Sequence, residues 1–209
     1  MSYYPFFGNP AVYVDPAIVT FVATPALAER GSSVPSVVLN WSIAKTPDVL
    51  KMNGVDIATN TKQTEMVGPF TDDASFKLVA GDKQKNVQAK ATITFCNNIH
   101  YGFVDAAPTD SAGVNALDNK VLQISRKHSV QIGSPEGKVF CYAYPARLGA
   151  AKVSADVPSD QWQPVANTVK FTHFASTTVS VTNGSGFTED YTVLTFTDRL
   201  AGSTAVHVG

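Results

Sequence analysis

The chain has 209 residues, of which 44% are hydrophobic and 16% are charged, and its formal net charge at pH 7 is -1. This apolar content excludes a disordered chain and is enough to build one large or two small cores. The near-zero net charge argues against a nucleic-acid partner, because such proteins carry an excess of Lys and Arg. No apolar run approaches the roughly 20 residues of a membrane span, and the first residues lack the basic start and apolar centre of a signal peptide. We therefore expect a soluble protein made in the cytoplasm, with no membrane partner.

The first residues, SYYPFFGNP, predict an extended N-terminal arm over residues 1–14. Its aromatic side chains stand beside prolines and lack the alternation of a strand. They are Tyr3, Tyr4, Phe6 and Phe7. In water these side chains would expose a sizeable apolar patch, so the arm either covers an edge of its own domain or docks onto a neighbouring subunit. We treat these aromatics as candidate partner-binding residues of an assembly arm.

Most of the following segments alternate apolar and polar residues, as a half-buried strand does. In SVVLNWSI, one face is apolar and predicts a core strand with a large aromatic in its middle. Its residues are Val37, Leu39, Trp41 and Ile43. The polar loop GDKQKN joins SFKLVA and NVQAKATITF into a hairpin. We find no convincing amphipathic helix, and PALAER has room for one turn before Gly31 and Pro35 end it. Further strands are expected in KVLQI, HSVQI, KVFCYAY, TVKFTHF, TTVSV and DYTVLTF.

Strands at this spacing, with turn residues between them, predict an all-β fold of two antiparallel β-sandwiches of the immunoglobulin-like type. The first sandwich is expected over 15–96 and the second over 97–209. The break lies at CNNIHYG, where the alternation gives way to polar residues and then to DAAPTDSAGVNALDN, a long loop of small residues. The chain would therefore consist of the arm followed by two domains.

The segment KVFCYAYP gathers a cysteine, aromatics and a proline, and could be a reactive site or a piece of sheet. Alternation puts Val139, Cys141 and Ala143 on one face and Phe140, Tyr142 and Tyr144 on the other. Both faces are largely apolar, which predicts a central or sandwiched strand. Cys141 is then a small core residue, since no neighbour on its face supplies the positive charge that a reactive thiol needs. Because the chain shows no export signal, we also expect no disulfide between Cys96 and Cys141.

The search for catalytic or metal-binding motifs is negative. The histidines lie far apart, and none is spaced from another histidine or a cysteine as in a zinc site. They are His100, His128, His173 and His207. Gly184–Gly186 predicts a hairpin turn rather than a nucleophile elbow. Asp72 and Asp73 lie in an expected turn, either solvated or able to bind a cation. We predict no catalytic residue, no metal and no cofactor.

The second half of the chain resembles a β-rich module of bacteriophage virion proteins, in which a YYAYP strand precedes a V-x-V-T-N-x-S-G-Y-x-x-x-Y-x-V-Y pattern. The matching residues are Tyr142, Ala143, Tyr144, Pro145, Val179, Val181, Thr182, Asn183, Ser185, Gly186, Phe187, Tyr191 and Val193. The chain departs from the pattern at Cys141 and Phe187, where the module has aromatic and tyrosine residues, and at 194–196. The first half, with LNWSI, MNGVDI and FTDDASFKLVAGDKQKNVQAKATITF, is similar to immunoglobulin-like and fibronectin-like domains that often precede this module.

The resemblance implies a non-enzymatic structural protein of the virion, located in the tail, baseplate or tail-fibre apparatus. Its partners would be other virion proteins and further copies of itself in a symmetric assembly. One rival interpretation is a head decoration or head-fibre protein. Another is receptor or glycan binding at the host surface, in which Tyr101, Tyr144 or Trp162 would stack on sugar rings. Trp162, in the loop SDQWQPV, is the strongest of these ligand-binding candidates, and its alternative is a loop anchor packed on the sandwich.

Overall fold

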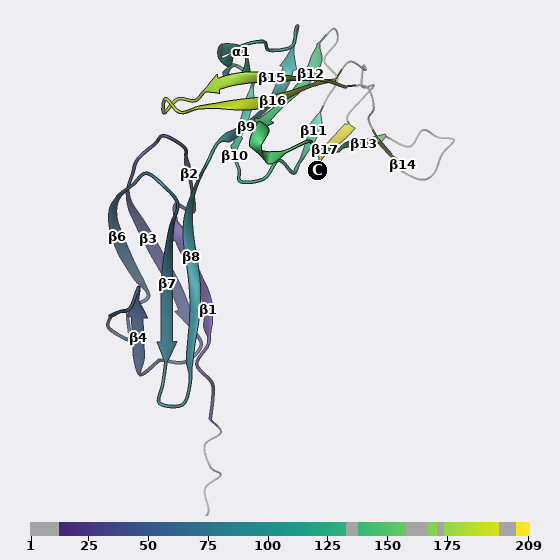
Figure 1. Ribbon diagram of the computed structural model, residues 1–209. Coiled ribbons are helices and arrows are strands. Elements are labelled where there is room, and N and C mark those ends of the chain that lie inside the picture. The colour runs from purple at the N-terminus through teal and green to yellow at the C-terminus, as the bar shows by residue number, and fades with distance from the viewer. Residues whose placement is uncertain (1–12, 133–137, 158–166, 171–173, 197–203) are drawn as a thin grey trace, which may run out of the picture. The chain divides into compact units, whose positions relative to one another are not determined.

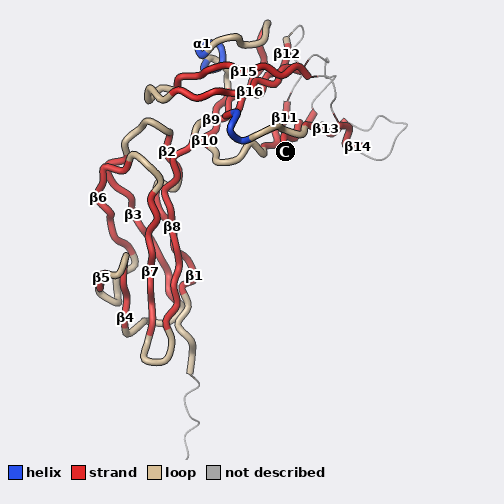
Figure 2. Tube along the Cα trace, in the orientation of Figure 1, coloured by secondary structure: helices blue, strands red, loops and turns tan. Residues whose placement is uncertain are grey.

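The computed structural model describes residues 13–132, 138–157, 167–170, 174–196 and 204–209. Within them the fold is all-β: the strands form four sheets, accompanied by one short α-helix and one 3-10 turn (Figure 1, Figure 2). Nearly all neighbouring strands run antiparallel, as the sequence predicts. No helix in these described ranges is long and apolar enough to cross a membrane.

The chain divides into two compact units. The first contains the chain up to Ala26 together with Pro35–Ile93, and the second contains Leu27–Val34 together with Thr94–Gly209. The sequence analysis placed the whole of 15–96 in the first domain, so residues 27–34 belong to a different unit from the one expected. The two units are described separately below.

The first unit is built from two antiparallel sheets. One has the order β1-β3-β6, with β1 at Ile18–Thr24, β3 at Val34–Ile43 and β6 at Gln63–Phe70. The other belongs to a five-stranded sheet with the order β2-β8-β7-β4-β5. Its strands are β2 at Leu27–Glu29, described below with the second unit, β4 at Val49–Met52, β5 at Val55–Asp56, β7 at Ala74–Gly81 and β8 at Asn86–Cys96. The rings of Phe70 on β6 and Phe76 on β7 meet edge to face, with centroids 5.8 Å apart, so the two sheets share a core.

The alternation read from the sequence places the core of the first unit correctly. Val37 and Leu39 are fully buried on β3, and Trp41 is 4% exposed. Leu78 on β7 and Ile93 on β8 are also fully buried. The predicted hairpin is confirmed, since β7 and β8 pair down to Gly81 opposite Asn86.

Residues 27–34 join the second unit through β2, at Leu27–Glu29. β2 pairs in parallel with the last residues of β8, from Leu27 opposite Thr94 to Glu29 opposite Cys96. The sequence reading of PALAER as one helical turn is therefore wrong. The local preference for a helix is outweighed by a hydrogen-bonded strand partner far away in the sequence.

The second unit also contains two sheets. The larger has the order β10-β9-β12-β16-β15, with β9 at Asn98–Val104, β10 at Asn119–Leu122, β12 at Val139–Pro145, β15 at Phe174–Thr182 and β16 at Thr188–Phe196. The smaller has the order β11-β17-β13-β14, with β11 at His128–Ile132, β13 at Val153–Val157, β14 at Asn167–Lys170 and β17 at Thr204–Val208. β12 is the middle strand of the larger sheet, which confirms the expectation of a central strand.

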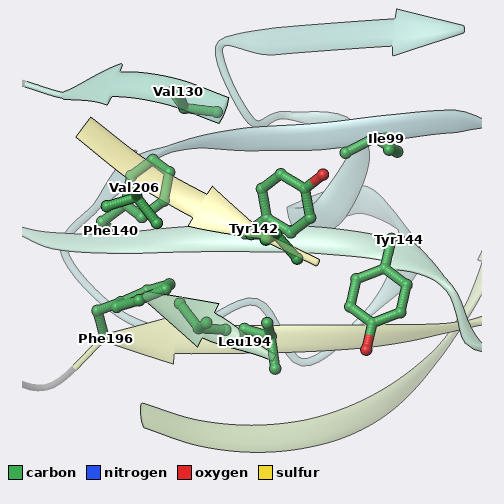
Figure 3. Close-up of a cluster of buried hydrophobic side chains, with 10 residues drawn as sticks. Ile99, Val130, Phe140, Tyr142, Tyr144, Leu194, Phe196 and Val206 are labelled. Atoms are coloured by element: carbon green, nitrogen blue, oxygen red, sulfur yellow. The ribbon is translucent and has the colours of Figure 1, made fainter. Parts of the chain in front are cut away.

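A buried cluster lies between the two sheets of the second unit (Figure 3). The larger sheet contributes Phe140, Tyr142 and Tyr144 from β12, together with residues of β9 and β16. The smaller sheet contributes Val130 and Val206, which lie across from the β12 side chains in Figure 3. One face of β12 therefore supplies the centre of this core.

The opposite face of β12 packs into a second cluster, which a short helix covers. This cluster contains Cys141 and Ala143 together with Val114 and Leu117. Val114 belongs to α1, at Ser111–Asn115, whose first turn is capped by the Asp110 side chain. The sequence analysis expected only a loop here, because five residues are too few to show an amphipathic pattern.

Candidate assembly surfaces

The binding residues singled out from the sequence lie outside the described part of the chain. They are the arm aromatics Tyr3, Tyr4, Phe6 and Phe7 and the loop residue Trp162. The described residues nearest to the arm begin at Tyr13, and these show how the arm is attached to the first unit.

Tyr13 is held by side chains far away in the sequence. Its hydroxyl lies 3.0 Å from both carboxylate oxygens of Asp82 and donates a hydrogen bond to them. Lys45 places its Nζ 2.9 Å from Asp82 Oδ2 and 4.8 Å from the centroid of the Tyr13 ring. The same ammonium group donates to the backbone oxygen of Val14 at 3.2 Å. One lysine therefore links the start of the described chain to the β7–β8 turn.

Asp82 is well placed for this role because the β7–β8 turn orients its carboxylate. Asp82 Oδ1 accepts hydrogen bonds from the backbone nitrogens of Gln84 at 2.9 Å and Lys85 at 3.0 Å. The hydrogen bond from Lys45 and these turn contacts hold the pKa of Asp82 far below its usual range. Partial desolvation and the bond to Asp82 raise the pKa of Tyr13 to about 12. Lys85 adds an ion pair with Asp15.

These contacts define an anchor for the arm, consisting of Tyr13, Asp15, Lys45, Asp82 and Lys85. At neutral pH the Asp82 carboxylate is charged and Tyr13 remains a phenol, so the Lys45–Asp82 ion pair and the Tyr13–Asp82 hydrogen bond are both attractive. The described chain therefore begins at a fixed point beside the β7–β8 turn.

The second surface is the β15–β16 turn, residues 183–187, which carries much of the resemblance pattern. Asn183 Oδ1 accepts hydrogen bonds from the backbone nitrogens of Ser185 and Phe187, each at 3.0 Å. Its Nδ2 donates to the backbone oxygen of Arg30 at 2.8 Å. Gly186 has a φ of 82°, as expected for a turn glycine. The predicted hairpin turn is confirmed, and it binds the segment after β2.

Gly31 lies directly under this turn. An added Cβ at Gly31 would be 2.9 Å from Phe187 Cβ and 3.1 Å from the backbone oxygen of Ser185, and its φ is 84°. The Arg30 guanidinium lies 5.7 Å from the centroid of the Phe187 ring, and Arg30 Nε donates to the backbone oxygen of Phe95 at 3.1 Å. Only glycine allows this close approach of turn and segment.

Two carboxylates of the second unit lie in the same polar network, and Glu29 contacts the turn directly. Glu29 accepts hydrogen bonds from Asn98 Nδ2 at 2.6 Å and from Ser185 Oγ at 3.1 Å. Glu189 accepts from Asn97 Nδ2 and forms an ion pair with Arg147 at 2.6 Å. Each carboxylate is thus held by donors that fix it in place, an arrangement typical of a structural polar network. Sequence reasoning missed this network, because its members come from four separate segments.

The aromatic residues proposed for sugar stacking differ in their exposure. Tyr144 is fully buried and its hydroxyl accepts a hydrogen bond from the backbone nitrogen of Ala151 at 3.1 Å, so the suggestion that it stacks on a ligand is wrong. Tyr101 is half-buried and stacks on Tyr142 with centroids 6.3 Å apart. Tyr144 lies on the same face of β12 as Phe140 and Tyr142, and this face packs into the core.

The two cysteines are unbridged, and one histidine contacts a serine: Ser129 Oγ lies 2.7 Å from His207 Nδ1. Cys96 and Cys141, both within the described ranges, are buried thiols rather than a disulfide. Burial raises the pKa of Cys141. Among the described residues, no group of three or more His, Cys, Asp or Glu side chains is placed to hold a metal ion.

A pocket of about 300 Å³ lies in the first unit. It is lined by Trp41, Ser42, Ile43, Thr46, Pro47, Thr59, Asn60, Thr61 and Lys62. Lys62 is the only ionisable side chain among these lining residues, so the pocket contains no acid–base pair.

Comparison with known proteins finds no protein-family model that matches the chain and no curated protein that matches its sequence.

Proposed function

We propose that this chain is a non-enzymatic structural protein of a phage virion, which binds other virion subunits in the tail, baseplate or tail-fibre apparatus. We further propose that its two units are immunoglobulin-like sandwiches, of the kind suggested by the sequence patterns. The resemblance of the second half to phage virion modules supports this role. The all-β fold is compatible with it, since such folds offer rigid edges and loops as binding surface.

The observation that carries the proposal is the anchor of the arm. Tyr13 and Asp15 are tied to Asp82 and Lys85, on the turn between β7 and β8. A free linker would need no such attachment, whereas an arm that reaches a neighbouring subunit gains from a fixed point of departure. Anchoring lowers the conformational entropy that is lost when the arm binds. The aromatics Tyr3, Tyr4, Phe6 and Phe7 would then supply the apolar contact.

The proposal is tested by deleting residues 2–10 and measuring incorporation into particles, with folding followed by circular dichroism. This deletion keeps the whole anchor from Tyr13 onward. We expect a normal fold and lost incorporation, because the apolar contact is removed while the body is intact. Unchanged incorporation would exclude an assembly role for the arm.

A matched variant separates the aromatics from the length of the arm. Replacing Tyr3, Tyr4, Phe6 and Phe7 by serine keeps every backbone atom and both prolines. We expect it to behave like the deletion. If the serine variant incorporates normally while the deletion does not, the arm acts through its backbone or length, and the aromatic contact is refuted.

A head decoration or head-fibre protein remains a rival within the same class, and the position of the chain in an electron-microscopy map of the particle distinguishes the two. Receptor or glycan binding is the rival from another class, and it depends on Trp162. Loss of binding to host cells on Trp162→Ala, with unchanged particle incorporation, would favour that alternative.

A further inference from the structure

β15 forms one edge of the larger sheet in the second unit. It pairs with β16 from Phe174 opposite Phe196 to Thr182 opposite Thr188, and β16 in turn pairs with β12. Among the described strands, none lies on the other side of β15 (Figure 1).

The backbone groups that face away from β16 can be assigned by residue. The nitrogen of Asn183 donates to the oxygen of Phe187 at 2.9 Å and so points toward β16. The nitrogen of Thr182 instead donates to Ser111 Oγ at 2.9 Å, and its oxygen accepts from Asn115 Nδ2 at 2.9 Å. Both groups of Thr182 therefore point away from β16, toward α1.

In an antiparallel ladder this direction alternates from one residue to the next. The outward groups therefore recur at Ser180, Thr178, Ser176 and Phe174, and the side chains of the first three are exposed. At Thr182 the helix α1 takes the place that a neighbouring strand would occupy, because its Ser111 and Asn115 side chains supply the missing donor and acceptor. From Ser176 to Ser180 no described residue does so, and the side chains at these outward positions are exposed.

This open edge lacks the devices by which proteins prevent strand pairing. Exposed edges are usually protected by charged side chains, prolines or short length. β15 spans nine residues, FASTTVSVT, with no charge, no proline and no glycine. By contrast, the β10 edge of the same sheet is four residues long and carries Lys120, and the β6 edge in the first unit carries Glu65 and Pro69.

We propose that this edge binds the same edge of a second copy of the chain, with the two β15 strands antiparallel about a two-fold axis at Thr178. Thr178 then faces Thr178 of the second copy, and Ser176 faces Ser180 of the second copy. These three outward positions meet outward positions, so every pair exchanges hydrogen bonds in both directions. In this register Phe174 would face Thr182 of the second copy, whose outward groups are occupied by α1, so the pairing is limited to the three positions.

The side chains favour a copy of β15 over a different strand. Ser and Thr pairs across strands are stabilising. The chain already uses such pairs, at Thr182 with Thr188 and at Thr20 with Ser42, each with hydroxyl oxygens 2.8 Å apart. A charged partner strand would find no opposite charge on this edge. The N-terminal arm is a poor alternative, since Pro5 and Pro10 cannot donate to a ladder.

This inference does not rest on the virion role and is tested on the isolated full-length protein. Thr178→Cys should form a disulfide-linked dimer under mild oxidation, because opposed residues in a hydrogen-bonded pair have Cα atoms about 5.5 Å apart, within disulfide range. Ser180→Cys is the matched control, since two copies of residue 180 would lie roughly 13 Å apart. The unmodified chain, whose two cysteines Cys96 and Cys141 are buried, gives the background rate of cross-linking.

We expect Thr178→Cys to cross-link at least ten times faster than Ser180→Cys, and the double variant Ser176→Cys with Ser180→Cys to cross-link as fast as Thr178→Cys. Equal rates for the two single variants would overturn the proposal, as would no cross-link above background. The yield is measured by mass under non-reducing conditions.

Sedimentation equilibrium gives a second readout that needs no cysteine. Thr178→Pro removes only an outward N–H group and leaves the bonds to β16 in place, so it should abolish a dimer that the wild type forms with increasing concentration. Thr178→Val keeps the backbone donor and should still dimerise. A wild type that stays monomeric up to millimolar concentration, or a proline variant that dimerises like wild type, would refute the β15 pairing.

Discussion

His100 on β9 is a buried histidine that lies directly opposite Lys120 of β10 in the sheet. It is 4% exposed, its Nδ1 has no hydrogen-bond partner among the described residues, and its ring meets Tyr191 edge to face with centroids 5.8 Å apart. Burial, together with the positive charge of Lys120 on the neighbouring strand, lowers the pKa of His100 from 6.5 to about 4. Between pH 6.5 and about 4, native His100 is therefore neutral while the unfolded chain is protonated.

This difference in pKa makes the second unit sensitive to acid. The unfolded state binds a proton near pH 6.5 and the folded state only near pH 4, so stability is complete above pH 6.5 and falls as the pH drops toward 4. The loss from this one group is about 3 kcal/mol. His100→Phe, which cannot titrate, should lose that much less stability between pH 7 and pH 4 in chemical unfolding. Parallel pH profiles for the two proteins would contradict the assignment.

The cysteines should be chemically quiet in the native protein. Cys141 is fully buried, and burial raises its pKa, so little thiolate forms at neutral pH. Cys96 is 1% exposed. We expect alkylation to be very slow in the folded state and to modify both thiols once the chain is unfolded without reductant, as read by mass spectrometry. A mass lower by two hydrogen atoms, with neither residue alkylated, would reveal a disulfide and contradict the structure.

Among the elements, strands with alternation were predictable and elements built on distant partners were not. The central position of β12 could be predicted from its sequence alone, because both of its faces are apolar and only a central strand buries both faces. α1 has five residues and leaves only Asp110 as a capping signal. β2 contains LAE, which favours a helix, and becomes a strand only through the end of β8.

At the candidate surfaces, too, local features could be predicted from the sequence and contacts between distant residues could not. The turn at Asn183–Gly186 follows from local chemistry, since Asn and Gly suit a tight turn. Its docking onto Arg30 does not, because the two residues are separated by most of the chain. Likewise, Tyr13 appears in the sequence as part of an aromatic arm, and its bond to Asp82 depends on the fold of the β7–β8 hairpin.

Two glycines offer a matched test of this docking. Gly31 and Gly186 have similar φ angles, 84° and 82°, but an added Cβ at Gly186 would meet nothing within 4 Å, whereas at Gly31 it would meet Phe187 at 2.9 Å. Gly186→Ala should therefore cost only the backbone strain, about 1 to 2 kcal/mol. Gly31→Ala adds a steric clash and should cost about 2 to 4 kcal/mol. The measurement is urea unfolding of both variants, and equal costs would mean that the turn does not pack on Gly31.

At the scale of the whole molecule, composition and periodicity indicate two cores, and the chain indeed forms two compact units. What they miss is that the chain enters the second unit early, at Leu27, leaves it after Val34 and returns at Thr94. No local sequence pattern marks the boundary between the units. It falls within a single strand, because β3 begins at Val34, in the second unit, and continues from Pro35 in the first. The sequence shows which residues are apolar, but the pairing of β2 with β8 assigns residues 27–34 to the second unit.

Each unit has its own buried core, so each should unfold in its own transition. Trp41 is 4% exposed in the first unit, and Trp41→Ala should cost on the order of 3 to 5 kcal/mol there. Leu194 is 2% exposed in the core of the second unit, and Leu194→Ala should cost about 2 to 5 kcal/mol there. These losses are a large part of the roughly 5 to 15 kcal/mol by which a domain is stable.

Calorimetry of the two variants therefore tests whether the units are independent. Trp41→Ala should lower or abolish one melting transition and leave the other at its wild-type temperature, while Leu194→Ala should affect the other transition alone. A conservative control, Trp41→Phe, keeps most of the buried ring and removes an indole N–H that has no hydrogen-bond partner in the described part of the chain, so it should cost much less than Trp41→Ala. If either alanine variant shifts both transitions together, the chain is one cooperative unit, because residues 27–34 then couple the stability of one core to that of the other.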